Sequence, residues 1–290
     1  MRIAISVGDA AGVGPEVTEK AIRQPEFAGI EFSVLGLPES AVVPGKPDPA
    51  NGLRAIEAVR QGTLGCLEGR FDALVTGPVN KAVVESAGVK FTGHTEYIAG
   101  LCGNPPVRML LASDRMRVIH VSTHVSLEQA CHLAATPRIL ETIRLAHSVL
   151  RSLGDPDGKI AVAGLNPHCG ENGLFGREDQ RQIVPAIEAA IAEGIPAMGP
   201  IPPDTLFYRA ARGEFAMVVA MYHDQGHIPS KLIAFDETVN ITVGLPIVRT
   251  SVDHGTAFDI AGQGKANPAN MISAIRFAKR LVRETTHEKL

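Results

Sequence analysis

The sequence predicts an α/β protein in which helices cover a mostly parallel β-sheet. Short runs rich in β-branched residues alternate with longer stretches of helical periodicity along the chain. The run Ala216–Met221 is apolar throughout, as in a strand that is buried on both faces. Gly and Pro punctuate many of the connections between the runs. Proteins of this class hold ligands in the loops that follow the carboxyl ends of their strands, so we expect the site there.

The N-terminal part of the chain shows this alternation. Arg2–Val7 is a predicted strand, followed by a glycine-rich turn and a helix that opens near Pro15, because proline suits the first helical turn. Four prolines in the segment 38–49 exclude regular structure and predict a surface loop. The other elements predicted in this part are a strand at Glu31–Leu35, a helix at Ala50–Leu67 and a strand at Ala73–Thr76.

The rest of the chain continues the pattern. Thr136–Leu153 is a predicted amphipathic helix with Thr136 as its N-cap, Pro137 in its first turn and Gly154 at its end. The remaining predicted strands are Arg108–Ala112, Arg117–Ser122, Lys159–Gly164 and Ala216–Met221, and the remaining predicted helices are Glu178–Glu193 and Pro268–Glu284.

Composition narrows the functional class. The chain has 290 residues, 45% of them apolar and 20% charged, with a net charge of −3. These values are typical of a globular enzyme and argue against nucleic acid as its main partner. No apolar run reaches the roughly 18 residues that a membrane span needs, the first residues do not look like a signal peptide, and the four cysteines lack metal or disulfide spacing. We expect a cytoplasmic protein that acts on a small molecule, with neither nucleic acid nor membrane as a partner.

A glycine cluster lies between the first predicted strand and helix. Its spacing, with Gly8, Gly12 and Gly14, is not the G-x-G-x-x-G of a Rossmann dinucleotide turn. Two interpretations stay open. A strand-to-helix turn needs glycine for steric reasons alone, but the same loop could also cover a ligand phosphate with its backbone N–H groups.

Three histidines follow predicted buried strands: His124, His168 and His223. Imidazoles that meet at such a sheet edge would suit zinc or a similar divalent ion and leave positions open for substrate oxygens. Their separations of 44 and 55 residues carry no local metal-site spacing. The residues alone therefore leave open both a shared metal site and three unrelated histidines.

Candidate anion-binding residues lie in two segments. His94 and Thr95 open a predicted helix, where free N–H groups attract anions, although Thr95 could equally be a simple N-cap. Lys231, Asn240 and Arg249 follow further along the chain. Arg249 comes directly after an apolar stretch, and a buried guanidinium either forms an internal salt bridge or meets a ligand carboxylate or phosphate. The sequence does not choose between these alternatives.

The segment Asp253–Pro268, DHGTAFDIAGQGKANP, resembles the adenosine-binding loop of the isopropylmalate and isocitrate dehydrogenases. This resemblance implies that His254 and Gly255 line an adenine pocket, that Asp259 accepts the ribose hydroxyls and that Asn267 reaches the adenine edge. A carboxylate at the ribose 2′-hydroxyl would repel a 2′-phosphate, so NAD is the expected cofactor and NADP the alternative.

Seven ordered blocks resemble the 4-hydroxythreonine-4-phosphate dehydrogenase family from end to end. They are Gly8–Glu16, Thr76–Lys81, Phe91–Glu96, Gly164–His168, Tyr222–Gly226, Asn240–Pro246 and Arg249–Gly255. By this resemblance, His124, His168 and His223 bind a divalent metal, with zinc expected and magnesium or cobalt as alternatives. The residues that it places on the substrate are His94, Thr95, Lys231, Asn240 and Arg249.

The resemblance also implies a fold and an assembly. The expected fold is the two-domain isocitrate/isopropylmalate dehydrogenase type, with helices on both faces of the sheet and the active site in the cleft between the domains. The first domain would comprise residues 1–90 and 259–290. The second, residues 91–258, would carry the metal histidines and the dimer interface. The family pattern implies a homodimer whose metal site takes ligands from both subunits.

The implied reaction is the oxidation, with decarboxylation, of 4-hydroxy-L-threonine 4-phosphate or a close phosphorylated hydroxy acid, as in pyridoxal phosphate (vitamin B6) biosynthesis. Lys231 or Asp224 would relay the proton. The chain departs from the family at Ala10, where proline is usual, and in its shorter 38–49 loop. The Gly226–Lys231 segment also differs from the usual Gly-Leu-Pro form. That difference leaves D-threonate or D-erythronate 4-phosphate, or a cis-dihydrodiol carboxylate, as alternative substrates. A non-enzymatic metabolite-binding protein is disfavoured, because the metal histidines, Lys231 and the dinucleotide loop are all present.

Overall fold

The computed structural model describes residues 1–38 and 41–287, which form two compact units. Unit 1 consists of Met1–Val107 and Val239–Val282, and unit 2 is built on Arg108–Thr238. Each unit has its own strands, its own covering helices and its own buried apolar cluster.

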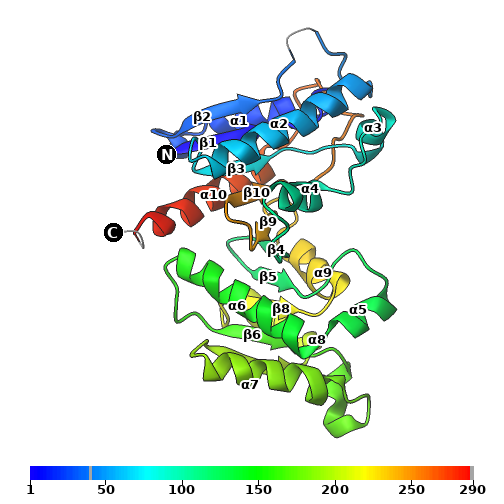
Figure 1. The fold of residues 1–290 in the computed structure, drawn as a ribbon, viewed down its shortest axis with the longest axis vertical. Coiled ribbons are helices and arrows are strands. Elements are labelled where there is room, and N and C mark those ends of the chain that lie inside the picture. The colour runs from blue at the N-terminus through cyan, green and yellow to red at the C-terminus, as the bar shows by residue number, and fades with distance from the viewer. Residues whose placement is uncertain (39–40, 288–290) are drawn as a thin grey trace. The chain divides into compact units, whose positions relative to one another are not determined.

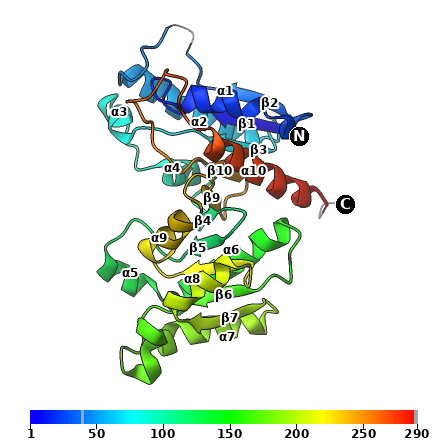
Figure 2. The ribbon, with the colours of Figure 1, turned by 180° about the vertical axis from the view of Figure 1, so that it is seen from behind.

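Unit 1 is a largely parallel sheet between helices (Figures 1 and 2). Its strands are β1 (Arg2–Ser6), β2 (Glu31–Leu35), β3 (Ala73–Thr76), β9 (Val239–Val243) and β10 (Val248–Ser251), in the order β2-β1-β3-β10-β9. Neighbouring strands are parallel except for the antiparallel pair of β10 and β9. The helices are α1 (Gly14–Ile22), the short η1 (Pro25–Phe27), α2 (Pro49–Leu67), α3 (Lys81–Ser86), α4 (His94–Leu101) and α10 (Ala269–His287).

Helices lie on both faces of the unit 1 sheet. α2 and α4 cover one face, and α1 and α10 cover the other (Figures 1 and 2). Val59 of α2, Leu74 of β3 and Ile98 of α4 are fully buried and pack together. Burial of such a side chain stabilises the fold by about 1.5–3 kcal/mol. These contacts fix α4, and with it the residues that open this helix, against the sheet.

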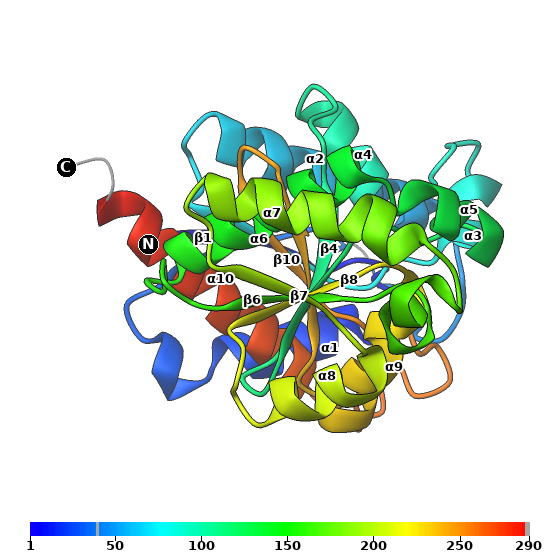
Figure 3. The ribbon, with the colours of Figure 1, turned by 90° about the horizontal axis from the view of Figure 1, so that it is seen from below.

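Unit 2 repeats the layered arrangement. Its strands are β4 (Arg108–Ala112), β5 (Arg117–His120), β6 (Ile160–Ala163), β7 (Ala197–Ile201) and β8 (Met217–Ala220), in the order β4-β5-β8-β6-β7. β4 and β5 are antiparallel, and the other neighbours are parallel. The helices are α5 (Leu127–Leu133), α6 (Thr136–Ser152), η2 (Pro167–Gly173), η3 (Asp179–Ile183), α7 (Val184–Ala192), α8 (Pro203–Ala211) and α9 (His223–Ala234). α6 and α7 cover one face of this sheet, and α8 and α9 cover the other (Figure 3).

The strand registers bring the site loops together within each unit. In unit 1, Thr76 of β3 pairs with Ser6 of β1 on one side and with Ser251 of β10 on the other. In unit 2, His120 of β5 pairs with Ala220 of β8, next to β6. Because these strands are parallel, their carboxyl ends meet at a common edge in each sheet. The loops that follow them therefore share that edge, as the sequence predicted.

The division into units differs from the expected domain boundaries at residues 90/91 and 258/259. It falls after Val107 and Thr238 instead. The reason is strand pairing and packing: β10 pairs with β3, β9 pairs with β10, and α4 packs on α2. These contacts draw both segments into unit 1. The metal histidines still fall together in unit 2, but most of the predicted anion residues do not.

Most predicted elements are confirmed, with boundary shifts of one to a few residues at most ends. The helix predicted over Glu178–Glu193 exists but begins as the π-helical turn η3. The prediction that Thr136 caps α6 is wrong, because Ala135 is the N-cap and the Thr136 hydroxyl donates to Gln182 instead. Residues 38 and 41–48 form no helix or strand, as predicted for this loop, while residues 39–40 lie outside the described part.

No helix in the described ranges is long and apolar enough to cross a membrane.

Candidate functional site

Arg249 is the centre of a buried cationic site in unit 1. It lies on β10 and is 2% exposed. Its Nη1 donates to Thr242 Oγ1 at 2.8 Å and its Nη2 donates to Thr76 Oγ1 at 2.7 Å. Its Nε is buried and has no hydrogen-bond partner among residues 1–38 and 41–287. The guanidinium is thus held by two neutral hydroxyls, and no carboxylate of the described chain forms an ion pair with it.

Arg249 nevertheless remains a cation at neutral pH. Burial lowers the pKa of its guanidinium from 12.5 to about 9, and the negative charge of Glu96 opposes part of that shift. Of the two alternatives that the sequence left open, the internal salt bridge is not formed with any carboxylate of residues 1–38 and 41–287. A buried charge without a counter-ion is costly, so an anionic ligand is the partner that would balance it.

His94 and Asn240, two other predicted site residues, also have buried polar atoms. His94 lies near the Arg249 charge, and Asn240 lies on β9, the strand that pairs with β10. His94 Nε2 and Asn240 Oδ1 are buried, and neither has a partner within the described part of the chain. The pKa of His94 falls to about 3, first because it is buried and then because Arg249 and Lys81 place positive charge near it. His94 is therefore a neutral imidazole at physiological pH. Buried polar groups without partners are rare in folded proteins, so a ligand that offers them hydrogen bonds would satisfy both atoms.

Local structure explains how these residues come together. Asn240 and Thr242 are two residues apart on β9 and so point to the same face. Thr242 lies beside Arg249 across the antiparallel β9–β10 pair, where Ile241 registers with Thr250. Thr95 and His94 form the first turn of α4, and Thr95 Oγ1 lies 3.5 Å from Thr242 Oγ1. The first N–H groups of a helix lack intrahelical acceptors and favour an anion.

Thr76 and Thr242 were not predicted as site residues. Both are almost completely buried, at 0% and 4% exposure, and both hold the guanidinium. The period of two along β9 was an available signal, because it places Thr242 on the same face as the predicted residue Asn240. No local signal connects Thr76 with Arg249, since parallel pairing of β3 and β10 brings them together.

A histidine-lined hollow forms a second candidate site, in unit 2. Its volume is about 690 Å³. The rings of His124 and His223 both line it, and their centroids are 5.7 Å apart. Imidazoles that share a tetrahedral zinc at about 2.0–2.1 Å have centroids roughly 5 Å apart. His223 Nδ1 donates to Asp224 Oδ1 at 2.6 Å, which leaves Nε2 as the ring nitrogen with a lone pair. The two rings therefore fit a divalent ion.

His168 does not join the other two histidines within one chain. Its exposed ring lies beside Phe175, with centroids 6.5 Å apart, in a run of left-handed residues from His168 to Asn172. Buried Asp179 anchors the start of this segment by accepting the Leu165 and Asn166 N–H groups. No group of three or more His, Cys, Asp or Glu side chains in the described chain could hold a metal ion. One subunit thus supplies two of the three predicted ligands at one place.

Gln225 ties the histidine loops to the sheet. Its Oε1 accepts the Met221 N–H at 2.7 Å, and its Nε2 donates to Gly164 O at 2.7 Å. It therefore joins the end of β8, which His223 follows, to the end of β6, which His168 follows. Lys231 lies on the same helix, α9, with its Nζ 5.8 Å from the Phe235 ring centroid. Gln225 was not predicted to have a role, because only the fold shows that its amide bridges two strands.

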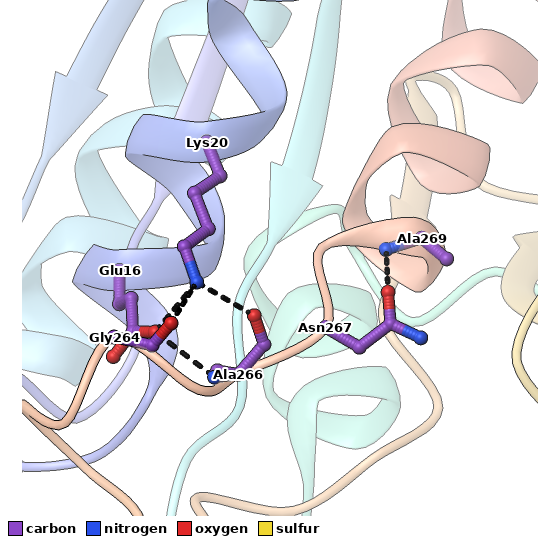
Figure 4. A network of polar contacts seen from close by, with 6 residues as sticks. All are labelled: Glu16, Lys20, Gly264, Ala266, Asn267 and Ala269. Carbon is purple, nitrogen blue, oxygen red and sulfur yellow. Dashed lines mark hydrogen bonds and ion pairs between the residues drawn. The ribbon is translucent and has the colours of Figure 1, made fainter.

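The predicted dinucleotide loop lies in unit 1. His254 Nδ1 donates to Gly255 O at 2.9 Å, while its buried Nε2 has no partner in the part of the chain that the structure describes. Asp259 is exposed, so its carboxylate is accessible. Asn267 Oδ1 accepts the Ala269 N–H at 3.0 Å at the start of α10. Its amide N–H groups point away from that bond (Figure 4).

The glycine cluster packs against other backbone segments, including this loop. A Cβ at Gly14 would lie 1.8 Å from Val7 O, and one at Gly12 would lie 2.6 Å from Thr256 O. Gly8 has a φ of +77° and would place a Cβ 2.1 Å from Pro78 O. Steric need alone therefore explains all three glycines, which supports the first of the two interpretations that the sequence left open.

The family described as pyridoxal phosphate biosynthetic protein PdxA matches residues 9–278 of this chain. The 4-hydroxythreonine-4-phosphate dehydrogenase of Desulforapulum autotrophicum is 46% identical, over 95% of this chain and 94% of that one. The D-threonate 4-phosphate dehydrogenase of Cupriavidus necator is 41% identical, over 94% and 95%. The crystal structure of 4-hydroxythreonine-4-phosphate dehydrogenase from Klebsiella pneumoniae superposes with a TM-score of 0.85 at 39% identity, covering 97% of this chain and 99% of that one.

More distant structures share only the fold. Isocitrate dehydrogenase from Methylococcus capsulatus superposes with a TM-score of 0.57 at 15% identity, over 99% of this chain and 87% of that one. This likeness confirms the predicted isocitrate dehydrogenase-like α/β fold. The matches that cover nearly the whole chain at 39–46% identity go further. The chain therefore belongs to the PdxA family and is an oxidoreductase, a dehydrogenase that acts on a CH–OH group.

Proposed function

We propose that this dehydrogenase catalyses the NAD-dependent and divalent-metal-dependent oxidation, with decarboxylation, of a four-carbon hydroxy acid 4-phosphate. The first candidate substrate is 4-hydroxy-L-threonine 4-phosphate, and D-threonate 4-phosphate is the alternative. Relatives of similar identity carry each of these names. The observation that carries the proposal is the buried Arg249 cation, which lacks a carboxylate partner in the described chain.

A phosphate satisfies the anion site better than an uncharged group does. Arg249 offers its unpaired Nε and full positive charge, and a guanidinium suits phosphate oxygens. The first turn of α4 adds backbone N–H groups and the Thr95 hydroxyl. His94 stays neutral here, so its Nε2 can serve as donor or acceptor according to its tautomer. We assign Lys231 to the substrate on family resemblance alone.

The metal would be held by His124 and His223, with His168 supplied by the partner subunit. When bound, a divalent cation would polarise the substrate's alcohol oxygen and the ketone formed from it. The contact between Asp224 and His223 Nδ1 supports an orienting role for Asp224. It leaves Lys231 as our choice for the proton relay.

Exposed apolar residues support a homodimer as the source of the third ligand. Ile228 and Leu232 on α9 are 56% and 82% exposed, and Phe235 at the C-cap of this helix is 70% exposed. Leu174 and Phe175, next to the His168 segment, are 72% and 46% exposed. Large apolar side chains gathered beside a site are typical of protein interfaces. We infer that a second copy covers them and that its His168 completes the metal site.

NAD would bind at the loop that contains His254, Gly255, Asp259 and Asn267. Asp259 would accept the ribose hydroxyls, and its negative charge disfavours the additional phosphate of NADP. The unpaired Nε2 of His254 and the amide N–H groups of Asn267 remain for the adenine.

The proposal is tested by a substrate panel read by NADH absorbance. The purified enzyme is given 4-hydroxythreonine 4-phosphate, D-threonate 4-phosphate, D-erythronate 4-phosphate and a non-phosphorylated cis-dihydrodiol acid, each with NAD and with NADP. We expect turnover with a 4-phosphate and NAD, loss of turnover after exhaustive chelation, and its return with Zn²⁺, Mg²⁺ or Co²⁺. Full activity without metal, or turnover of the diol acid alone, would overturn the proposal.

A further inference from the structure

Two residues on α1 bind the dinucleotide loop although neither belongs to it. Lys20 Nζ donates to Gly264 O at 2.8 Å and to Ala266 O at 2.9 Å. Glu16 Oε1 accepts the Ala266 N–H at 2.9 Å. Both backbone polar groups of Ala266 are therefore held from α1, across about 250 residues of sequence (Figure 4).

The two side chains also hold each other. Glu16 and Lys20 are one helical turn apart, and Lys20 Nζ donates to Glu16 Oε1 at 2.8 Å. The ammonium thus uses all three of its N–H donors, one on Glu16 and two on the loop. Burial is the largest single influence on the pKa of Glu16 and raises it. The hydrogen bonds from Lys20 and from the Ala266 N–H, together with the positive charge of Lys20, outweigh burial and lower the pKa. Glu16 is therefore ionised at neutral pH.

The loop needs this support because it has no regular secondary structure between Gly255 and Pro268. Backbone groups that the turns of this segment leave without a partner need one elsewhere, and α1 supplies partners for Gly264 and Ala266. The residue after Ala266 is Asn267, which is tied to the first turn of α10. The clamp made by Glu16 and Lys20 therefore fixes the backbone immediately before a residue of the dinucleotide site.

We propose that Glu16 and Lys20 are positioning residues for the dinucleotide, which hold the Gly264–Asn267 backbone in its binding conformation. This inference rests on the proposed NAD function, because the loop matters only where a dinucleotide binds. Neither side chain needs to touch the cofactor. Their loss should weaken dinucleotide binding and leave binding at the Arg249 anion site unchanged.

The test compares Lys20→Met with Arg23→Met. Arg23 forms an ion pair with Glu19 on the same helix at the same i,i+4 spacing, but this pair does not contact the loop. NADH affinity is measured by fluorescence titration without substrate or metal, and KM values for NAD and for the phosphorylated acid are measured separately. We expect Lys20→Met to weaken NADH binding roughly tenfold, because binding must then order a loop that has lost two hydrogen bonds to α1. KM for the phosphorylated acid should stay within about twofold, and Arg23→Met should match the wild type.

If Lys20 only stabilised the fold, Lys20→Met would change the KM for NAD and the KM for the phosphorylated acid to a similar extent. Amide exchange provides a second readout, since Ala266 N–H should exchange faster in Lys20→Met once the clamp is weakened. If circular dichroism shows that Lys20→Met does not fold, Glu16→Gln, which keeps the size of the side chain, decides the question by the same titration. Equal NADH affinity in the wild type and the folded variant would overturn the inference. Absence of NADH binding by the wild type would instead overturn the proposed cofactor.

Discussion

Replacement of Arg249 by Met should weaken ligand binding strongly at little cost to the stability of the ligand-free protein. This expectation is unusual, because loss of a buried polar residue commonly destabilises a fold. It follows from the surroundings of Arg249, which hold its charge with two threonine hydroxyls and no carboxylate of the described chain. Methionine is unbranched and flexible enough to occupy the space of the aliphatic part.

The magnitude can be worked from the burial of the charge. The pKa of Arg249 falls from 12.5 to about 9. At about 1.36 kcal/mol per pH unit, this fall corresponds to roughly 5 kcal/mol against the charged form. Two hydrogen bonds from a charged donor return about 1.5–3 kcal/mol each. The two contributions nearly cancel, so we expect the free energy of unfolding to change by less than about 2 kcal/mol.

Ligand binding should respond very differently. A hydrogen bond between a charged group and a phosphate contributes about 1.5–3 kcal/mol, which corresponds to a KM that is roughly 10- to 150-fold higher when it is lost. The wild type should also be stabilised by inorganic phosphate, because a ligand that binds only the folded state raises its stability. Arg249→Met should not show this stabilisation.

Urea unfolding, thermal shift with and without phosphate, and KM measurements check the three expectations. Arg108 provides a matched control, since it is 5% exposed but forms an ion pair with Glu141 at 2.5 Å. Arg108→Met should lose more stability than Arg249→Met and keep the phosphate response. The reasoning is refuted if Arg249→Met loses as much stability as Arg108→Met, or if phosphate still stabilises it.

Three further predictions concern the supports of the site. His94 has a folded pKa of about 3, below its unfolded value near 6.5, so its contribution to stability is complete above pH 6.5 and is lost as the pH falls toward 3. The fall in urea midpoint from pH 7 to pH 5 should therefore be smaller in His94→Gln than in the wild type, whereas the exposed control His132→Gln should match the wild type. Gln225→Leu leaves the Met221 N–H and Gly164 O without their Gln225 partner, which should lower the free energy of unfolding by roughly 2–5 kcal/mol. A loss below about 1 kcal/mol would show that the Gln225 amide contributes little to stability. Gly14→Ala forces a Cβ to within 1.8 Å of Val7 O and should lower Tm strongly, whereas Gly100→Ala, whose nearest neighbour would be 4.0 Å away, should leave Tm unchanged or raise it.

The sequence by itself determined many of the elements and the order in which they follow one another. β1, β2 and β3 were predicted because alternation and β-branching are local properties of a few residues. The positions of His124, His168 and His223 after buried strands followed from the same patterns. Several elements were not predicted, among them the helices α3, α5, α8 and α9 and the strands β7, β9 and β10. α9 contains Pro229 in its interior, where local rules predict a break. The family resemblance could also be recognised from the sequence, because each of its seven blocks is a short run of consecutive residues.

Only the tertiary structure decided which of these residues meet. Strand order places His124 and His223 at one hollow, and a left-handed backbone run carries His168 elsewhere. Parallel pairing brings Thr76 to Arg249, and helix α1 reaches the loop at Ala266 through Lys20. Each of these contacts joins residues that are far apart in the chain. Their formation depends on how strands pair and how helices pack, and neither property is contained in the local spacing of residues.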